Sequence, residues 1–542
     1  EVARTGAVAT GPPPITVPDD PGRLIPSDAW LVAYVPSLDR VEARWREVVA
    51  AFDEEEAQQL NLAEELSWET GLDAALLDRD RPAVLALSRP FGLGARPLLT
   101  LVLPVTDPPV AAAQFREEAG DQATVVSSGG YVAASMKRGY APGEATPGIA
   151  RDLPAGDLSV RLDLRPFADA VRPAVELGAL GALGVPGAER MLAWIEDVLD
   201  SVHLLEAGLT LSGGKAELRL ALTFLKGSPL DRPRAADGAP LVDLAKSLAA
   251  GDYPIVWLMQ ADWAALVDTV IIPVYWGMLE GLRVPEELRR AALGQKGRSR
   301  EVYELMGPSL ALGGRIGDGG IEFVGVAQPK DPAAYLARFR ELTTGGELAA
   351  LGIGFTTAEV EVEGFEVDRF TIRFDVDQLM STLAKTHGRE ASPGERAAAR
   401  TAVSATLDPF FGRGGLVFVQ GPAGNRTVAV IGRRQGLVGT AFRTAKERSG
   451  TLPAAAARAL AAAKGETTFF LYLDLRAVMA GFLEIGRKVR ESLPTRKTGR
   501  VPQVPAGPPV PCWIRCSSEG RTTQIHLRLD LGGLGAIIRG LD

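Results

Sequence analysis

The segments LPVTDPPVAAAQFRE, residues 103–117, and AQPKDPAAYLARFRE, residues 327–341, decide how this chain is organised. In each one an apolar strand leads into Asp-Pro, and Phe-Arg-Glu begins eight residues after the aspartate. An aspartate at the N-cap accepts hydrogen bonds from the first helical turn, and proline suits the first helical position. Both segments therefore predict the same strand, cap and helix, and the two aspartates are 224 residues apart.

A second pair of segments has the same separation. The strand entered through Asp28 continues as AWLVAYVPSLDRV, and the strand entered through Asp252 continues as YPIVWLMQADWAALV. Each is an apolar strand followed by a polar capping position and an amphipathic helix. Asp28 and Asp252 are again 224 residues apart, and one separation shared by two segments indicates an internal duplication.

Two later pairs are shifted relative to the first two. The motif Leu-Asp-Leu-Arg occurs at 162–165 and at 473–476, an offset of 311, and the hairpin around Leu218 matches that around Leu527 at an offset of 309. The second copy therefore carries roughly 85 additional residues, which we place at about 355–450. Alternation within that insertion puts Glu359, Glu361 and Glu363 on one strand face, which we interpret as a solvated face.

The order of the predicted elements defines the fold class as α+β. Helices fall between strands that meet in short glycine turns, which favours two tandem copies of a mainly antiparallel sheet with helices packed on one face. The predicted parts are a flexible N-terminal tether at 1–23, a first module at 24–226, a linker and connecting helix at 227–250, and a second module at 251–542. A chain of 542 residues exceeds the size of one hydrophobic core, in agreement with two modules.

Composition excludes several classes of protein. Hydrophobic residues make up 46% and charged residues 23%, as in folded soluble proteins, and the net charge of −8 is spread along the chain, which argues against nucleic acid as a partner. The apolar stretch 264–282 is interrupted by Asp268, Pro273 and Glu280, so it predicts a buried helix or pocket wall rather than a membrane span. The tether is typical of exported proteins and is compatible with membrane anchoring through the N-terminus.

We find no constellation typical of a catalytic, metal-binding or cofactor-binding site. His203 and His526 lie beside apolar strand residues, and His387 lies at the predicted end of a helix, so all three are interpreted as structural. Cys512 and Cys516 lie on one predicted strand with their Cα atoms about 13 Å apart, beyond the reach of a disulfide unless the strand bends. We therefore predict no catalytic residue, no metal ligand and no cofactor.

The segment 253–282 departs from the average composition because it is rich in aromatic residues. Three interpretations stay open for it: core, which is the simplest, a partner surface, or a pocket for an apolar ligand. Its candidate residues are Tyr253, Trp257, Trp263, Tyr275 and Trp276.

The start of the first module resembles a known group of proteins. Pro26-Ser-Asp-Ala opens a strand that runs into Leu38-Asp-Arg-Val and a helix, similar to uncharacterised bacterial extracytoplasmic proteins whose repeated modules open with a Pro-x-Asp-Ala/Thr strand. The resemblance covers 26–50 and, without the leading Pro-Ser, 251–272. It implies repeated modules in an exported protein, and it supplies no catalytic residues.

Three functions are expected in order of preference. The first is a non-catalytic exported binding or scaffold protein, an accessory subunit of a larger assembly that binds a protein partner outside the cytoplasm, in the periplasm or at the cell surface. The second is a carrier of an apolar ligand such as a lipid, held near Trp257. The third is a hydrolase that uses dispersed carboxylates.

Overall fold

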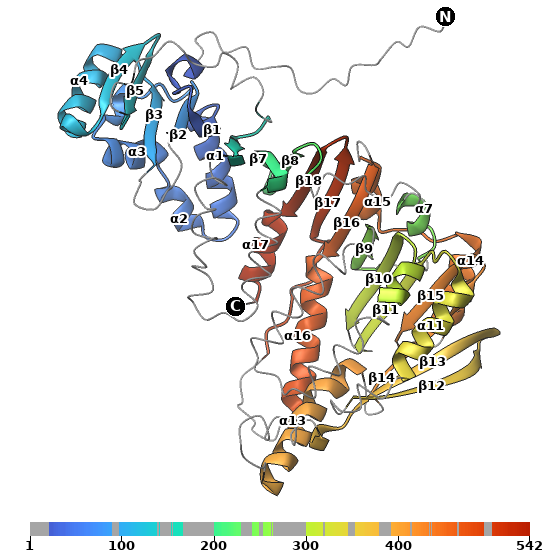
Figure 1. Ribbon diagram of the computed structural model, residues 1–542. Helices are drawn as coiled ribbons and strands as arrows, with labels where there is room; N and C mark the ends of the chain where they lie inside the picture. Colours follow the sequence, from blue (N-terminus) through green and yellow to red (C-terminus); the bar gives the residue numbers. More distant parts are fainter. Residues whose placement is uncertain are drawn as a thin grey trace, which may run out of the picture. The chain divides into compact units, whose positions relative to one another are not determined.

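The computed structural model describes residues 21–88, 97–137, 140, 153, 155–165, 200–228, 241–248, 253–261, 263, 300–317, 320–344, 353–378, 392–411, 415–432, 434, 436–462, 466–492 and 501–541. The chain forms two compact units: unit 1 is Glu1–Ala174 with Leu199–Leu225, and unit 2 is Val175–Val198 with Lys226–Asp542. Both contain helices and antiparallel strands, so the predicted α+β class is confirmed (Figure 1). Residues 1–20 of the predicted tether and the whole stretch 264–282 lie outside the described residues.

The sheet of unit 1 has the strand order β4-β5-β3-β2-β1-β6-β7-β8, and every neighbouring pair is antiparallel. The strands are β1 (Ala29–Val35), β2 (Ala83–Ser88), β3 (Leu98–Pro104), β4 (Thr124–Ser128), β5 (Tyr131–Ser135), β6 (Leu158–Asp163), β7 (Val202–Ser212) and β8 (Lys215–Phe224).

The described helices of unit 1 begin at side-chain caps. They are α1 (Leu38–Ala50), α2 (Glu54–Gln59), α3 (Leu62–Thr70) and α4 (Pro108–Ala119). Ser37 caps α1 by accepting from the Arg40 amide at 3.1 Å, and Asp107 caps α4 by accepting from the Val110 amide at 3.2 Å, as the Asp-Pro motif predicts.

Unit 1 has a hydrophobic core on each face of its sheet. Ala63 of α3 and Phe115 of α4 pack against Leu103 on one face. On the other face the 3₁₀ helix Pro21–Leu24 places Leu24 against Val32, and the hydroxyl of Tyr140 donates to the Leu24 carbonyl. The described chain therefore begins inside the core, at the end of the predicted tether.

The sheet of unit 2 has the strand order β12-β13-β14-β15-β11-β10-β9-β16-β17-β18, again with antiparallel pairs throughout. The strands are β9 (Ile255–Gln260), β10 (Ser309–Gly317), β11 (Gly320–Ala327), β12 (Ile353–Val362), β13 (Phe365–Phe374), β14 (Leu416–Ala423), β15 (Arg426–Ile431), β16 (Glu466–Asp474), β17 (Pro511–Glu519) and β18 (Thr522–Asp530).

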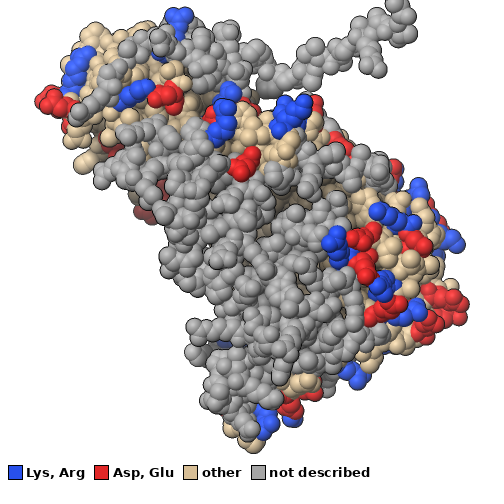
Figure 2. Space-filling view, in the orientation of Figure 1, with Lys and Arg blue, Asp and Glu red and all other residues tan. Residues whose placement is uncertain are grey.

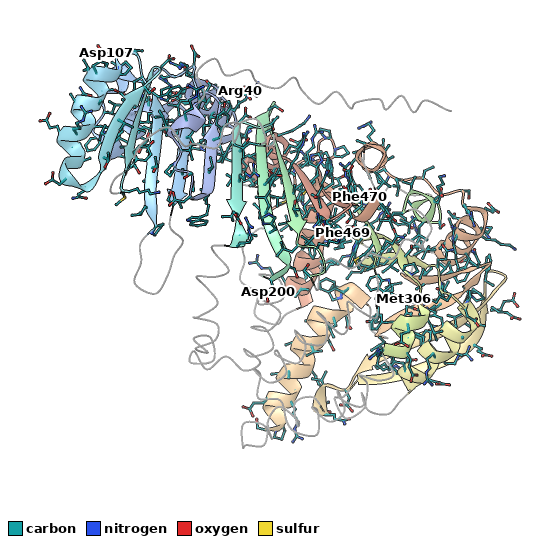
Figure 3. All side chains as sticks on the ribbon, turned by 45° about the horizontal axis from the view of Figure 1, so that its top comes forward. Arg40, Asp107, Asp200, Met306, Phe469 and Phe470 are labelled. Carbon is teal, nitrogen blue, oxygen red and sulfur yellow. The ribbon has the colours of Figure 1, made fainter. Side chains whose placement is uncertain are left out.

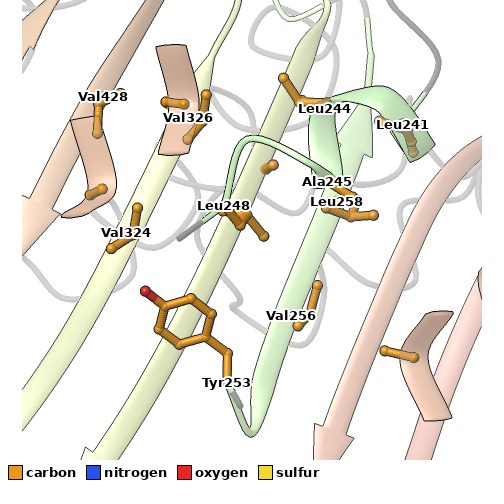
Figure 4. Close-up of a cluster of buried hydrophobic side chains, with 14 of the residues drawn as sticks. Leu241, Leu244, Ala245, Leu248, Tyr253, Val256, Leu258, Val324, Val326 and Val428 are labelled. Carbon is orange, nitrogen blue, oxygen red and sulfur yellow. The ribbon is translucent and has the colours of Figure 1, made fainter. Parts of the chain in front are cut away.

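Helices of unit 2 cover both faces of its sheet, which corrects the prediction of helices on one face. Successive strand residues point to opposite faces. Val256 of β9 packs with Leu244 and Phe442 in one core (Figure 4), whereas Met259 packs against a second core that contains Leu336. The strands can be covered twice because their residues on both faces are apolar. The helices of unit 2 that lie wholly in the described parts of the chain or have bounds there are α7 (Leu241–Ala245), α11 (Pro332–Thr344), α13 (Pro393–Phe411), α14 (Leu437–Glu447), α15 (Ala454–Ala461), α16 (Leu475–Ser492) and α17 (Leu531–Arg539).

The hairpin of β12 and β13 is attached to α14 through its turn. Glu363, which has φ 53° in this turn, accepts from the amide of Gly436 at 3.0 Å and from that of Gly439 at 2.8 Å. A carboxylate is favourable at a helix N-terminus because the first amides have no partner within the helix and carry partial positive charge. Glu363 thus holds the hairpin on α14.

Candidate binding faces

The three described members of the aromatic candidate set do not share one surface. Tyr253 is buried in the core under α7 and α14, with its ring against Gly313, where an added Cβ would lie 2.6 Å from the ring. Burial raises the pKa of the Tyr253 hydroxyl. Trp263 is buried in the second core with Leu336, whereas Trp257 is 36% exposed. Tyr275 and Trp276 lie outside the described residues.

Trp257 lies on the sheet face opposite Tyr253, because Val256 and Leu258 beside it point into the Tyr253 core. Its partners in register are Leu312 on β10 and Leu471 on β16. The edge of its ring meets Phe469, with centroids 6.4 Å apart; Figure 3 labels Phe469 and the next residue, Phe470, on β16. Trp257 is therefore part of an apolar sheet face.

Unit 1 has a continuous apolar face of the same kind. Six leucines stand opposite one another on six neighbouring strands, and all six are half-buried. At about 4.8 Å between strands, this row is about 24 Å long. From β8 to β3, the row is Leu222, Leu205, Leu162, Leu31, Leu87 and Leu99.

A second row of apolar side chains runs beside the leucines, two residues further along each strand. Its members are also half-buried, so the face is two rows deep. From β8 to β3, the row is Leu220, Ala207, Val160, Ala33, Leu85 and Leu101. We call these twelve side chains the unit 1 apolar face; it lies on the same side of the sheet as the α3 and α4 core, against which Leu101 packs. Aliphatic side chains offer no hydrogen-bonding group, so such a face recognises apolar surface by the hydrophobic effect.

An ion pair lies at the end of β6, beside Leu162 of the leucine row. Asp163 accepts from Arg165 Nε at 3.1 Å and from Nη2 at 2.8 Å. Partial burial raises the pKa of Asp163, but the hydrogen bonds and charge of Arg165 outweigh it, so the pKa of this carboxyl is lowered. His203 Nδ1 lies 3.8 Å from the same carboxylate.

Both cysteines are free thiols on β17. They flank Ile514 on the Trp257 side of the sheet, and Cys512 pairs with Leu473 while Cys516 pairs with Phe469. Burial raises the pKa of the Cys512 thiol, which favours the unreactive protonated form. They are therefore part of the unit 2 apolar surface.

Of the other two histidines, the structure describes His526. His526 stacks edge-on against Trp513 with centroids 4.6 Å apart, and its Nδ1 lies 3.4 Å from Arg515. His387 lies outside the described residues. Within the described parts of the chain, no three His, Cys, Asp or Glu side chains are grouped as metal ligands would be. The same parts contain no helix that is long and apolar enough to cross a bilayer.

The comparisons with known proteins give little further information. No protein-family model and no curated protein matches the chain. Two solved structures, crystal forms III and IV of TP0453, are similar with TM-scores of 0.22 and identities of 9% and 10%. Each comparison covers 56% of this chain, and 99% and 97% of the respective TP0453 chains.

The unit 1 apolar face was missed by sequence reasoning because it depends on register. Leu158, Val160 and Leu162 alternate with Ser159 and Arg161, which indicates one apolar face on that strand alone. Which leucines of other strands stand opposite them is decided by strand pairing, and a shift of one residue would reverse every side chain. The sequence therefore indicated an apolar face on each strand, but it did not indicate which residues of different strands form one row.

Proposed function

We propose that this chain is a non-catalytic binding protein made of two copies of one module, and that its binding sites are the apolar faces of the two sheets. The duplication is supported by strand order. When β12 and β13 are left out, the strand order of unit 2 is β14-β15-β11-β10-β9-β16-β17-β18. Each of these strands then corresponds to the strand at the same place in the unit 1 order β4-β5-β3-β2-β1-β6-β7-β8.

Residue register also supports the duplication. One transverse row passes through Ala33 in unit 1 and another through Trp257 in unit 2, the two positions that are 224 residues apart. The rows are Val125, Ala134, Leu101, Leu85, Ala33, Val160, Ala207 and Leu220, and Gln420, Ala429, Gly325, Leu312, Trp257, Leu471, Ile514 and Leu527. The last hairpin is displaced by one residue pair, because the row aligns Leu527 with Leu220 rather than with Leu218.

The shared Leu-Asp-Leu-Arg motif adopts the same local structure in both units. Asp163 accepts from the Arg165 amide at 3.1 Å at the end of β6, and Asp474 accepts from the Arg476 amide at 3.1 Å at the end of β16. This is the turn in which a carboxylate bonds the backbone two residues ahead. Under the proposal, the additional part of the second copy narrows from about 355–450 to Ile353–Phe411, which contains β12, β13 and α13.

The ligand class is proposed from the leucine row of unit 1. Leucine side chains that keep part of their surface in water lose hydrophobic stabilisation at about 25 cal/mol for each Å² left exposed. Large apolar patches on soluble proteins are usually interaction sites. We therefore place an apolar molecule, such as a lipid chain, on this face, which is the second of the functions expected from the sequence.

Titration of the purified full-length protein with the apolar fluorescent dye 1-anilinonaphthalene-8-sulfonate tests the proposal. We expect Leu31→Asn, in the middle of the leucine row, to weaken dye binding at least tenfold. Val110→Asn, a control on α4 with a side chain that is already 45% exposed, should leave binding unchanged. Equal dye binding by wild type and Leu31→Asn would refute the proposed face.

The remaining parts of the proposal have separate tests. An exported location predicts that the full-length protein appears in the extracytoplasmic fraction of its native cells. The absence of catalysis predicts no turnover in a panel of hydrolase substrates, and turnover that is lost on changing one carboxylate would revive the hydrolase hypothesis. A role as accessory subunit needs a surface for a protein partner, and the surface proposed for unit 1 in the next subsection has its own test.

A further inference from the structure

Trp68 on α3 is the most exposed large hydrophobic side chain in the described residues, with 88% of its surface accessible. A tryptophan in this position contributes nothing to the core of unit 1, because the opposite side of α3 packs there through Ala63. Isolated exposed tryptophans are depleted on ordinary surfaces and enriched at protein interfaces. Its environment indicates which kind of partner would cover it.

The segment that carries Trp68 is acidic, and the nearby Arg46 of α1, which donates to the Leu60 carbonyl at 2.7 Å, is already paired with Glu42. Residues 53–70 contain seven acidic side chains and no Lys or Arg, and all seven are exposed. None of them forms an ion pair with another of the described residues. They are Asp53, Glu54, Glu55, Glu56, Glu64, Glu65 and Glu69.

This charge pattern differs from that of the described residues on the face seen in Figure 2. Figure 2 shows basic and acidic side chains close together over much of the described surface. On α3, Glu64 and Glu65 precede Trp68 by four and three residues, so they lie on the same side of the helix. The ring is therefore bordered by unpaired carboxylates.

The helix that carries Trp68 is held rigidly at both ends. At its start, Asn61 accepts from the Glu64 amide at 3.3 Å, and the Glu42 carboxylate accepts from the Leu62 amide at 2.9 Å. At its end, Gly71 has φ 65° and its amide donates to the Ser67 carbonyl at 2.8 Å. A rigid helix presents an aromatic side chain with little loss of entropy on binding.

We propose that this face of α2 and α3, which we call the Trp68 surface, docks a basic polypeptide segment of a partner protein. Lys or Arg side chains of the partner pair with the carboxylates, and an Arg guanidinium or an apolar side chain covers the indole ring. An anionic membrane surface would be repelled by the same carboxylates. This surface belongs to unit 1 alone and is independent of the apolar faces.

Fluorescence titration of the full-length protein with a labelled oligo-arginine peptide tests the proposal. We expect binding that weakens with added salt, a weakening of at least tenfold by Trp68→Ala, and loss of binding in the double variant Glu64→Lys, Glu65→Lys. Trp45→Ala is a matched control, because Trp45 is 41% exposed on α1 but lies between Arg44 and Arg46. It should bind the peptide as wild type does.

Three results would overturn the proposal. One is equal binding of the peptide by wild type and Trp68→Ala, and another is equal binding of an oligo-glutamate peptide of the same length. The third is retention on anionic phosphatidylglycerol vesicles that Trp68→Ala abolishes, because this would assign the surface to a membrane. Dye binding at the apolar face is measured separately, so either proposal can fail while the other stands.

Discussion

Glu42 is expected to be sensitive to substitution, because its carboxylate joins three segments of unit 1. Its side chain is 8% exposed and accepts from Arg46 at 2.6 Å, from Arg79 at 2.8 Å and from the Leu62 amide at 2.9 Å. It thereby links α1 to the start of α3 and to the segment before β2. Glu42→Ala removes all three interactions and leaves two arginines without this partner.

The expected decrease in the free energy of unfolding depends on how exposed the two arginine partners of Glu42 are. Breaking a buried ion pair costs about 3–5 kcal/mol when the remaining charge stays buried. The side chains of Arg46 and Arg79 are 44% and 32% exposed and can regain water, so we expect the low end, about 3 kcal/mol. For a unit of this size each kcal/mol corresponds to roughly 2–4 °C in Tm, which gives a decrease of about 6–12 °C.

Differential scanning calorimetry of the full-length protein measures this decrease as a shift in the transition of unit 1. Glu47→Ala is the control on the same helix, because Glu47 is 46% exposed in its pair with Arg44 and should change the free energy of unfolding by less than about 0.5 kcal/mol. Glu42→Gln keeps the shape of the side chain without its charge, and its decrease in Tm should lie between those of Glu42→Ala and Glu47→Ala. A Glu42→Ala shift no larger than that of Glu47→Ala would show that the network has no stabilising role.

Three further predictions concern other contacts. Glu363→Ala should raise amide exchange of the β12–β13 hairpin about two- to fivefold by hydrogen-exchange mass spectrometry, the effect of about 0.5–1 kcal/mol at a helix N-terminus; unchanged exchange would contradict the attachment. Burial raises the pKa of Tyr140 to about 12, so the stability it contributes is present below about pH 10 and is lost as pH rises towards 12. Tyr140→Phe should remove that part of the alkaline loss in pH-dependent denaturation. Alkylation in denaturant without reductant should modify both Cys512 and Cys516, and a single modification or none would disprove free thiols.

The local motifs of this fold could be predicted because their physical causes are local. Asp331 accepts from the amides of Ala333 and Ala334 at 3.0 and 3.1 Å, as its Asp-Pro motif indicates. The interaction depends on the aspartate and the two or three residues after it. An antiparallel α+β arrangement likewise follows from short strands, glycine turns and amphipathic helices that the sequence shows directly.

Contacts between distant segments could not be predicted in the same way. Glu363 was expected on a solvated strand face with Glu359, but β12 ends at Val362, and the turn carries Glu363 to an α14 amide 76 residues away. Glu359 and Glu361 are exposed as predicted, and Glu359 also pairs with Arg340 at 2.8 Å while its side chain stays 75% exposed. Trp68 was missed for the opposite reason, since a tryptophan with no tertiary partner carries no signal of its exposure in the sequence. Patterning identifies buried positions more readily than exposed ones.

Under the duplication proposal, the two apolar faces have the same strand order, but side chains of different size stand at equivalent positions. Position for position, Ala33 in unit 1 corresponds to Trp257 in unit 2, and the neighbouring Val160 corresponds to Leu471. An alanine leaves space above the middle of the sheet, whereas an indole ring fills it. A ligand that lies flat along the leucine row of unit 1 would meet the Trp257 ring in unit 2. The two copies would then bind differently shaped molecules, or one of the two faces would bind while the other serves as support.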